Sequence, residues 1–311
     1  MDSARMEGGP NRNLVILRAG DASLHGTWLP MPGCKRNWDL HISYFGSKEA
    51  PTPLDADGVT WSRDTDNNKW NGIARALGRQ MFSLDDYDYV AIPDDDLIGS
   101  PDTWNAAFDL ARRHHLGACQ LSLHHASFFG YLDTLKRPFL ELRYVPVIEL
   151  MAGIIRVDVF KKMIPYLSLE DNLWGMDYVL ARLLSEQRRS MAILDAVSVL
   201  HTRAFWTGPL YISSRASGRS LHQIEADFLS RHGLERVERR NLGGLTRSGR
   251  FFKRLWWTAP FLIPARALRK YRFLRGLLRI AHAEDGRVYL LRRIASMPGL
   301  EVAPDKVAKT R

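Results

Sequence analysis

The 311-residue sequence lacks the glycine-rich motifs that mark several large enzyme classes. It contains no G-x-G-x-x-G, no G-x-x-x-x-G-K-[S/T] and no G-x-S-x-G stretch. Each of these motifs uses glycine to bring backbone close to phosphate or to expose a nucleophilic serine. Their absence argues against dinucleotide-binding dehydrogenases, P-loop nucleotide hydrolases and α/β-hydrolases.

Cysteine and long apolar runs are also scarce. The two cysteines, Cys34 and Cys119, are far apart and have no metal-ligand spacing, which suits a reducing compartment. The N-terminus has no signal-peptide pattern. The apolar stretch 255–265 is broken by Pro260 and Pro264 and is shorter than the roughly 20 residues that a membrane-spanning helix needs. We therefore expect a cytoplasmic protein.

Charge is unevenly distributed along the chain. The formal net charge is +10, and hydrophobic residues make up 45% of the sequence, as in ordinary globular proteins. Residues 231–311 contain 20 Lys and Arg against 6 Asp and Glu, so the preceding part is slightly acidic. Together with aromatic residues between 251 and 262, this basic region suits the anionic inner face of the cytoplasmic membrane. The alternative is a helical subdomain with solvated arginines. No nucleic-acid-binding module accompanies the charge, so nucleic acid is not expected as a partner.

Apolar segments alternate with amphipathic ones, which predicts an α/β fold with a largely parallel sheet. We expect a flexible N-terminus over 1–12, a catalytic domain over 13–235, and a basic, helical C-terminal extension over 236–311 that includes a linker at 241–250 and a helix over 267–281. The predicted strands are 13–20, 38–46, 87–93, 116–123, 145–157 and 191–202, and the predicted helices are 66–82, one from Ser100, 158–166, 176–188 and 221–229.

Three consecutive carboxylates, Asp94, Asp95 and Asp96, follow the predicted strand 87–93. Ligands of α/β sheets collect beyond the carboxyl ends of the strands, so this position favours a binding site. Oxygen ligands favour Mg²⁺ or Mn²⁺, which bind few carboxylates and complete their shell with phosphate and water. The competing interpretation is a solvated turn that leads into the helix at Ser100.

Two further polar residues lie at element ends. Asp177 falls in the first turn of the predicted helix 176–188, where the helix dipole favours a carboxylate. His201 ends the apolar strand 191–202 and would reach the same sheet edge as the acidic triplet. An ordinary helix-start aspartate and a packed or capping histidine are the alternative interpretations.

Taken in order, four segments resemble the glycosyltransferase-like proteins grouped as domain of unknown function 707. The resemblance covers about residues 12–205, and the sequence departs from it at Leu121, where proline is usual. The matching stretches are YDYVAIPDDDL with Asp94 and Asp96, ACQLSL, VIELMAGIIRVDVF with Glu149, Met151 and Ala152, and DNLWGMDYVL through ILDAVSVLH with Trp174, Gly175, Asp177, Asp195 and His201.

The resemblance implies a GT-A-like nucleotide-diphospho-sugar transferase fold for the catalytic domain over 13–235 and a cation, Mn²⁺ or Mg²⁺, that stabilises the leaving diphosphate. It implies that Asp96 and His201 ligate the metal and that Asp94 contacts the metal shell or the nucleotide, with Asp95 as a spacer facing away. Asp177 is the expected general base, with Glu149 as second choice or acceptor binder. The expected donor-binding set is Asp94, Arg18, Trp174 and Gly175, with Arg18 pairing with a phosphate.

The predicted function is metal-dependent transfer of a sugar from a nucleotide-sugar donor to a glycan or lipid-linked acceptor, as in polysaccharide biosynthesis. The alternative is a non-catalytic GT-A-like protein that binds nucleotide or glycan or acts as a membrane-surface scaffold. Metal-dependent phosphoester hydrolysis is a third hypothesis, and it needs more carboxylate and histidine ligands than the sequence offers.

Overall fold

The computed structural model describes residues 12–29, 34–51, 58–66, 68–167, 174–204, 218, 220–255 and 257–258. The predicted helix over 267–281 and almost all of the predicted flexible N-terminus lie outside these residues. Among the helices of the described part, none is long and apolar enough to cross a membrane.

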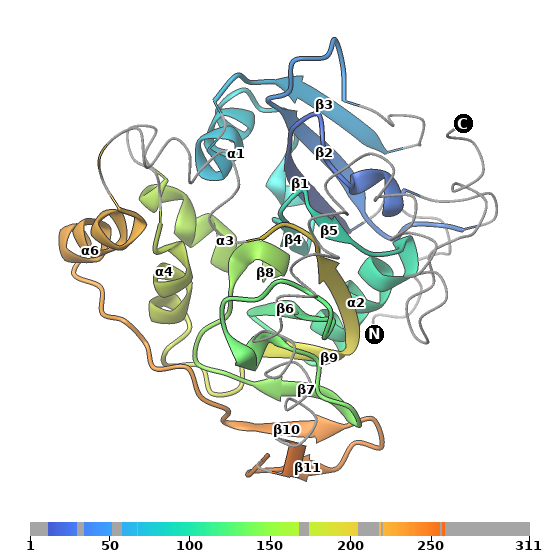
Figure 1. Ribbon diagram of the computed structural model, residues 1–311, viewed down its shortest axis with the longest axis vertical. Helices are drawn as coiled ribbons and strands as arrows, with labels where there is room; N and C mark the ends of the chain where they lie inside the picture. The colour runs from blue at the N-terminus through green and yellow to red at the C-terminus, as the bar shows by residue number, and fades with distance from the viewer. Residues whose placement is uncertain are drawn as a thin grey trace, which may run out of the picture.

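A single mixed sheet forms the centre of the molecule (Figure 1). The spatial order is β3 (Val59–Arg63), β2 (Asp39–Tyr44), β1 (Asn13–Ala19), β4 (Tyr89–Ala91), β8 (Gly153–Arg156), β6 (Ala118–Leu123), β9 (Met191–His201), β7 (Leu140–Tyr144), β10 (Gly243–Thr246) and β11 (Phe251–Phe252). Strands β3, β2, β1, β4, β6 and β9 all run in one direction, whereas β8 runs antiparallel between β4 and β6. β5 (Leu97–Ile98) pairs with the end of β9.

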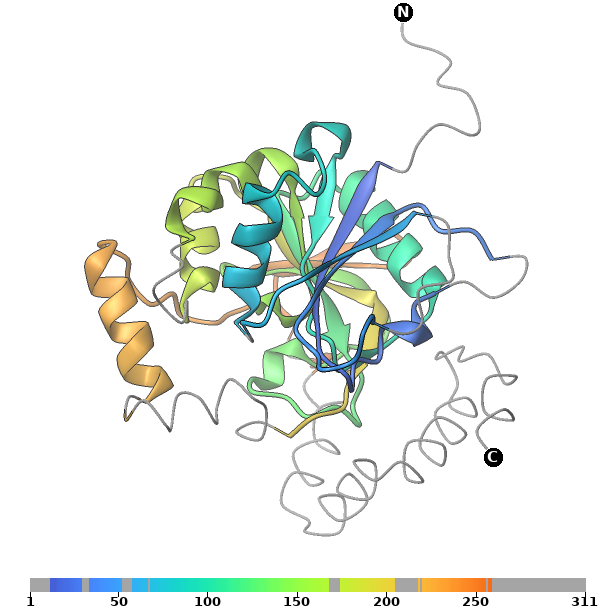
Figure 2. The ribbon, with the colours of Figure 1, turned by 90° about the horizontal axis from the view of Figure 1, so that it is seen from above.

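Helices cover both faces of this sheet (Figure 2). One face carries α1 (Lys69–Gly78), α3 (Val157–Met163) and α4 (Met176–Leu183), with α6 (Leu221–Arg231) beside α4, and the other carries α2 (Pro101–Arg113). Short 3-10 turns complete the fold: η1 (His25–Thr27), η2 (Leu84–Asp86), η3 (Leu132–Thr134), η4 (Leu150–Ala152) and η5 (Ile164–Tyr166).

Strand β1 shows how the sequence builds this layering. Successive side chains of a strand point to opposite faces of the sheet, so an uninterrupted apolar run contributes side chains to a core on each face. Leu14 and Ile16 pack in the core under α1, α3 and α4, whereas Val15 and Leu17 pack in the core under α2. The predicted α/β class is confirmed: the sheet is mixed and mostly parallel with helices on both faces, as expected for a GT-A-like fold.

The helix starts follow their local sequence signals. Ser100 caps α2 by accepting a hydrogen bond from the backbone N–H of Thr103 at 3.1 Å, and Pro101 occupies the first helical position, as predicted. α1 has a cap of the same kind, because the side chain of Asn68 accepts hydrogen bonds from the first N–H groups of the helix. The observed helices stay within a few residues of the predicted ranges, although α4 ends at Leu183 rather than at residue 188.

Two predictions from the sequence are wrong. The stretch 145–157 is not one strand, because only Gly153–Arg156 is extended and Leu150–Ala152 is a 3-10 turn. The stretch 241–250 is not a linker, because Gly243–Thr246 pairs with β7 and Phe251–Phe252 pairs with β10. A Cβ atom on Gly244 would lie 2.8 Å from the carbonyl oxygen of Leu142, so this glycine allows β10 to pair closely with β7.

Candidate active site

The acidic triplet 94–96 follows the carboxyl end of β4, as predicted, and Asp95 and Asp96 form a turn. Its backbone is bonded to two segments that are distant in sequence. The carbonyl oxygen of Asp95 accepts from the N–H of Leu24 at 2.7 Å, and that of Asp96 accepts from the N–H of Thr202 at 3.1 Å. These bonds fix the turn between the end of β1 and the end of β9. The position of each carboxylate relative to its neighbours is therefore fixed as well.

Asp96 and His201, the two residues predicted as metal ligands, form a buried pair. Oδ2 of Asp96 lies 3.1 Å from Nε2 of His201, and each residue is 5% exposed. Burial by itself raises the pKa of Asp96, but the charge of His201 and the hydrogen bond between them hold this pKa below its ordinary value. Burial lowers the pKa of His201, and the charge of Asp96 overrides that effect and raises it to about 9.

The pair has two features that suit a divalent cation. Nδ1 of His201 is hydrogen-bonded to the carbonyl oxygen of Phe128 at 2.7 Å, which fixes the ring and directs Nε2 toward Asp96, as outer-shell carbonyls do for metal-binding histidines. Oδ1 of Asp96 is buried and has no hydrogen-bond partner within the described residues. A cation beside this oxygen would satisfy it.

The described residues contain no cluster of three or more His, Cys, Asp or Glu side chains arranged around a metal position. Asp94, the third expected member of the metal shell, is turned toward a lysine: its Oδ1 lies 2.7 Å from Nζ of Lys69, and its side chain is 40% exposed. A cation at Asp96 and His201 would therefore take its other ligands from water or from donor phosphates, as Mg²⁺ commonly does.

Asp95 differs from the expected spacer. Its carboxylate is buried, accepts a hydrogen bond from the N–H of Gly20 at 3.0 Å, and pairs with Nη1 of Arg203 at 2.8 Å. Burial raises the pKa of Asp95, and the Arg203 charge opposes that rise. A charge this deeply buried needs a partner, so Asp95 and Arg203 together hold the ends of β1, β4 and β9 in place.

Lys69 is a residue of the site that sequence reasoning missed. Its ammonium group donates to Oδ1 of Asp94 at 2.7 Å and to the carbonyl oxygen of Leu150 at 2.8 Å. It thereby joins the first residue of α1 to the acidic turn and to η4. A single lysine at a helix start has no motif that would have identified it from the sequence.

Asp177 lies in the first turn of α4, where it was predicted. Its carboxylate accepts a hydrogen bond from the backbone N–H of Leu150, and burial raises its pKa to about 6, partly opposed by the positive charge of Arg239. Gly175 precedes the helix with a φ of +123°, a conformation that favours glycine. Trp174 and Gly175 are both partly exposed at this helix start.

Glu149 is the second expected carboxylate and is more deeply buried. Burial raises its pKa to about 8, and the negative charge of Asp177 adds to that rise, which places the two groups near enough to interact. Its Oε2 has no hydrogen-bond partner in the described part of the chain. At neutral pH the two carboxyl groups are therefore in different states: Asp177 is mostly ionised and Glu149 is mostly protonated.

Arg239 is the second residue that the sequence did not reveal. It comes from the segment after α6, and its guanidinium lies 3.8 Å from the centre of the Tyr131 ring and 3.7 Å from Oδ2 of Asp133. Its charge acts on both Glu149 and Asp177. The candidate site thus includes a residue from beyond the predicted boundary at 235.

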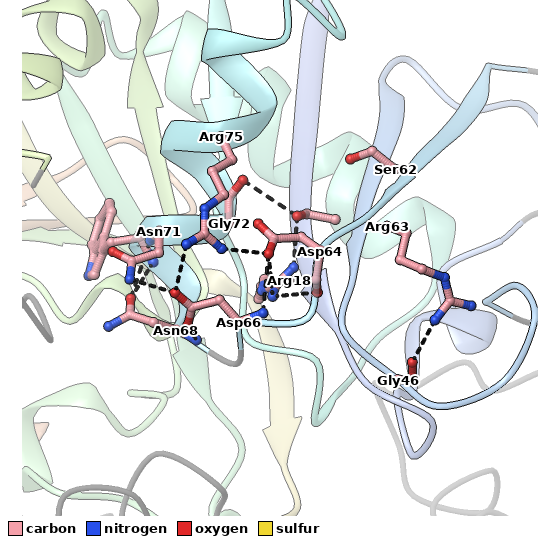
Figure 3. A network of polar contacts seen from close by, with 12 residues as sticks. Arg18, Gly46, Ser62, Arg63, Asp64, Asp66, Asn68, Asn71, Gly72 and Arg75 are labelled. Atoms are coloured by element: carbon pink, nitrogen blue, oxygen red, sulfur yellow. Dashed lines mark hydrogen bonds and ion pairs between the residues drawn. The ribbon is translucent and has the colours of Figure 1, made fainter. Parts of the chain in front are cut away.

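Arg18 lies in β1 on the face covered by α1 (Figure 3). Its guanidinium donates to Oγ of Ser43 and to the carbonyl oxygen of Asp64, both at 2.9 Å. The close approach of α1 depends on Gly72, where a Cβ atom would lie 2.5 Å from Cδ of Arg18. Arg18 is 4% exposed, so in this arrangement it joins α1, β1 and β2, and a phosphate would have to replace one of its present partners.

Asp195, which the resemblance also matched, is a structural residue in this arrangement. Its carboxylate is fully buried and pairs with Nε of Arg143 at 2.9 Å, and it accepts a hydrogen bond from the N–H of Arg137 at 2.7 Å. The pair links β9 to β7 inside the sheet.

No protein-family model and no curated protein matches the sequence. Among solved structures, residues 1–349 of S. aureus TarS are 15% identical, with a TM-score of 0.41 and 71% of each chain covered. The same protein in complex with UDP is 14% identical, with a TM-score of 0.37 and 71% of each chain covered. Its complex with UDP-GlcNAc is 13% identical, with a TM-score of 0.39, covering 71% of this chain and 72% of the other.

Proposed function

We propose that this chain is a metal-dependent glycosyltransferase that moves a sugar from a nucleotide-sugar donor to a hydroxyl group of a glycan or lipid-linked acceptor. The observation that carries the proposal is the buried Asp96–His201 pair, in which one carboxylate oxygen has no partner within the described residues. A divalent cation held by Asp96 and His201 would stabilise the negative charge that develops on the leaving diphosphate.

The chain's own groups have separate tasks in this proposal. In the inverting form of the reaction, the acceptor oxygen attacks the anomeric carbon, the bond from that carbon to the diphosphate breaks, and a carboxylate accepts the proton of the acceptor hydroxyl. Asp177 is suited to that role because its pKa of about 6 leaves it ionised at neutral pH and still basic enough to accept a proton. Glu149, with a pKa of about 8, is suited to donate a hydrogen bond to the acceptor.

Several charged residues support these groups without touching the reacting atoms. Lys69 fixes Asp94, and Arg203 neutralises Asp95 behind the acidic turn. Arg239 supplies positive charge beside Glu149 and Asp177 and so favours their ionised forms. The arrangement separates an ionised carboxylate, which accepts a proton, from a protonated one, which binds a hydroxyl group.

The test is release of nucleoside diphosphate from a panel of nucleotide sugars, with Mn²⁺ or Mg²⁺ and with a chelator. We expect metal-dependent release that Asp177→Asn lowers by about 10²-fold or more, the contribution typical of general base catalysis, while nucleoside diphosphate binding is kept. Asp158→Asn is the matched control, because Asp158 is also in the first turn of a helix but lies exposed beside Arg156. Metal-dependent nucleotide binding without release of product from any sugar would favour the non-catalytic alternative instead.

A further inference from the structure

Strands β10 and β11 lie at one edge of the sheet (Figure 1), and the hairpin that they form is rich in basic residues. We call residues 243–254 the basic hairpin; it comprises β10, its turn, β11 and the two residues that follow. Its sequence, GGLTRSGRFFKR, contains no acidic residue. Its four basic side chains, Arg247, Arg250, Lys253 and Arg254, are all exposed.

A strongly exposed phenylalanine lies beside this hairpin. Phe139 is 63% exposed, the highest value among the large hydrophobic residues of the described chain. Its carbonyl oxygen accepts a hydrogen bond from the N–H of Arg247 at 3.3 Å, which places it next to the hairpin turn. Lys136 is also nearby, because the charge of Arg247 contributes to the lowered pKa of its ammonium group.

The hairpin is firmly attached to the body of the protein. β10 pairs with β7 over four residue pairs, and Leu255, just after the hairpin, is buried. The hydroxyl of Thr258 is fully buried and accepts a hydrogen bond from Nη1 of Arg137 at 2.8 Å. The positive charge is therefore presented on a fixed surface, and the sequence that follows, 259–311, adds 12 Lys and Arg against 4 Asp and Glu.

We propose that the basic hairpin and Phe139 form a docking surface for an anionic lipid bilayer. Exposed basic side chains attract the negative surface of a cytoplasmic leaflet. A neighbouring aromatic ring gains by leaving water for the boundary between headgroups and acyl chains, while the flanking basic groups stay in the headgroup layer. Positive charge and an exposed apolar ring occur together at this edge. The ring favours a lipid bilayer as the occupant, because a partner that is only acidic would attract the basic groups but offer no apolar layer to the ring.

Aromatic rings within the hairpin keep this surface ordered. The guanidinium of Arg250 lies 4.9 Å from the centre of the Phe252 ring, and that of Arg189 lies 4.0 Å from the centre of the Phe251 ring. These contacts hold both phenylalanines partly buried, whereas Phe139 is 63% exposed and is the most accessible large hydrophobic side chain at this edge. The docking proposal is independent of the proposed glycosyl transfer, because it uses no residue of the candidate active site.

The experiment is co-sedimentation of the full chain with unilamellar vesicles, either of neutral phosphatidylcholine alone or with about a third phosphatidylglycerol. We expect binding only to the anionic vesicles, and loss of that binding at high salt. The triple variant Arg247→Ser/Arg250→Ser/Lys253→Ser should lower the partition coefficient by about 100-fold. The matched control, Lys48→Ser/Lys162→Ser/Arg182→Ser, removes the same charge from exposed positions elsewhere and should change it little.

Phe139→Asn tests the apolar part separately and should weaken binding by about tenfold. Phe139 has a φ of +71°, a region that asparagine tolerates well, so this variant should fold at least as stably as the natural chain. Equal losses in the two triple variants, or equal binding to neutral vesicles, would overturn the proposal. So would hairpin-dependent binding to a single-stranded oligonucleotide that exceeds binding to anionic vesicles, which would assign the surface to nucleic acid.

Discussion

Nε2 of His201 lies 3.1 Å from Oδ2 of Asp96, although the two residues are separated by more than a hundred positions in the chain. The first ends β9 and the second follows β4, and the sheet brings both to one edge. A histidine and a carboxylate that are both buried stabilise one another only as a pair, so neither tolerates removal of the other alone.

The first prediction concerns this pair. His201→Ala leaves the Asp96 carboxylate buried without its partner, so the free energy of unfolding should fall by about 3–5 kcal/mol. The double variant His201→Ala/Asp96→Ala removes both charges and should recover part of that loss. Chemical denaturation of the three proteins measures the effect, and a double variant less stable than the single one would contradict the explanation.

The second prediction concerns the fully buried pair of Arg143 and Asp195. Asp195→Asn removes the charge that faces the guanidinium inside the sheet, and we expect a loss of about 3–5 kcal/mol of unfolding free energy. Asp158→Asn, at an exposed pair, should change the free energy by less than about 0.5 kcal/mol. Similar effects at the two positions in urea denaturation would show that burial of the pair is not what makes it important.

The third prediction follows from the raised pKa of Glu149. Because the folded state binds the proton more tightly than the unfolded chain, the stability that this gives is complete below about pH 4.5 and is lost as pH rises through about 8. Glu149→Gln cannot ionise, so it should be more stable than the natural chain at pH 9, by a few kcal/mol at most, and the difference should shrink toward pH 5. Thermal unfolding of both proteins at the two pH values measures this, and a difference that grows toward pH 5 would be the wrong sign.

The fourth prediction compares two glycines of α1. Gly72→Ala would place a methyl group 2.5 Å from the buried side chain of Arg18 and should lower the free energy of unfolding by about 1–3 kcal/mol. Gly78→Ala is the control, since no atom lies within 4 Å of the position of its added methyl group. It should stabilise the protein slightly, by up to about 1 kcal/mol. Equal changes in the free energy of unfolding at both positions would mean that contact with Arg18 does not determine the effect of Gly72→Ala.

Much of the sheet could be predicted because its strands are local apolar runs with clear ends. Residues 13–20 and 191–202 are mostly apolar segments, and Ser100 with Pro101 marks the start of α2. The same reasoning predicted that Asp96 and His201 lie at one edge of the sheet, because parallel strands have their carboxyl ends at the same edge.

What the sequence did not reveal depends on contacts between distant segments. Asp95 resembles a spacer until Arg203, from beyond β9, is placed beside it. Gly243 and Gly244 resemble a linker in the sequence. Their role is to let β10 pair closely with β7, and that role can be recognised only from the positions of both strands in the fold. Lys69 and Arg239 belong to no motif, and the fold alone brings them to the acidic groups.

The central claim is that Asp96 and His201 hold a cation that binds the diphosphate of a nucleotide donor. It is tested most directly by thermal unfolding of the full chain with a panel of nucleoside diphosphates, with and without Mn²⁺, in the natural protein and in Asp96→Asn. We predict an increase in Tm that requires both Mn²⁺ and at least one nucleoside diphosphate, and that Asp96→Asn abolishes while still unfolding cooperatively. No increase with any nucleotide, or an equal increase in Asp96→Asn, would contradict the claim.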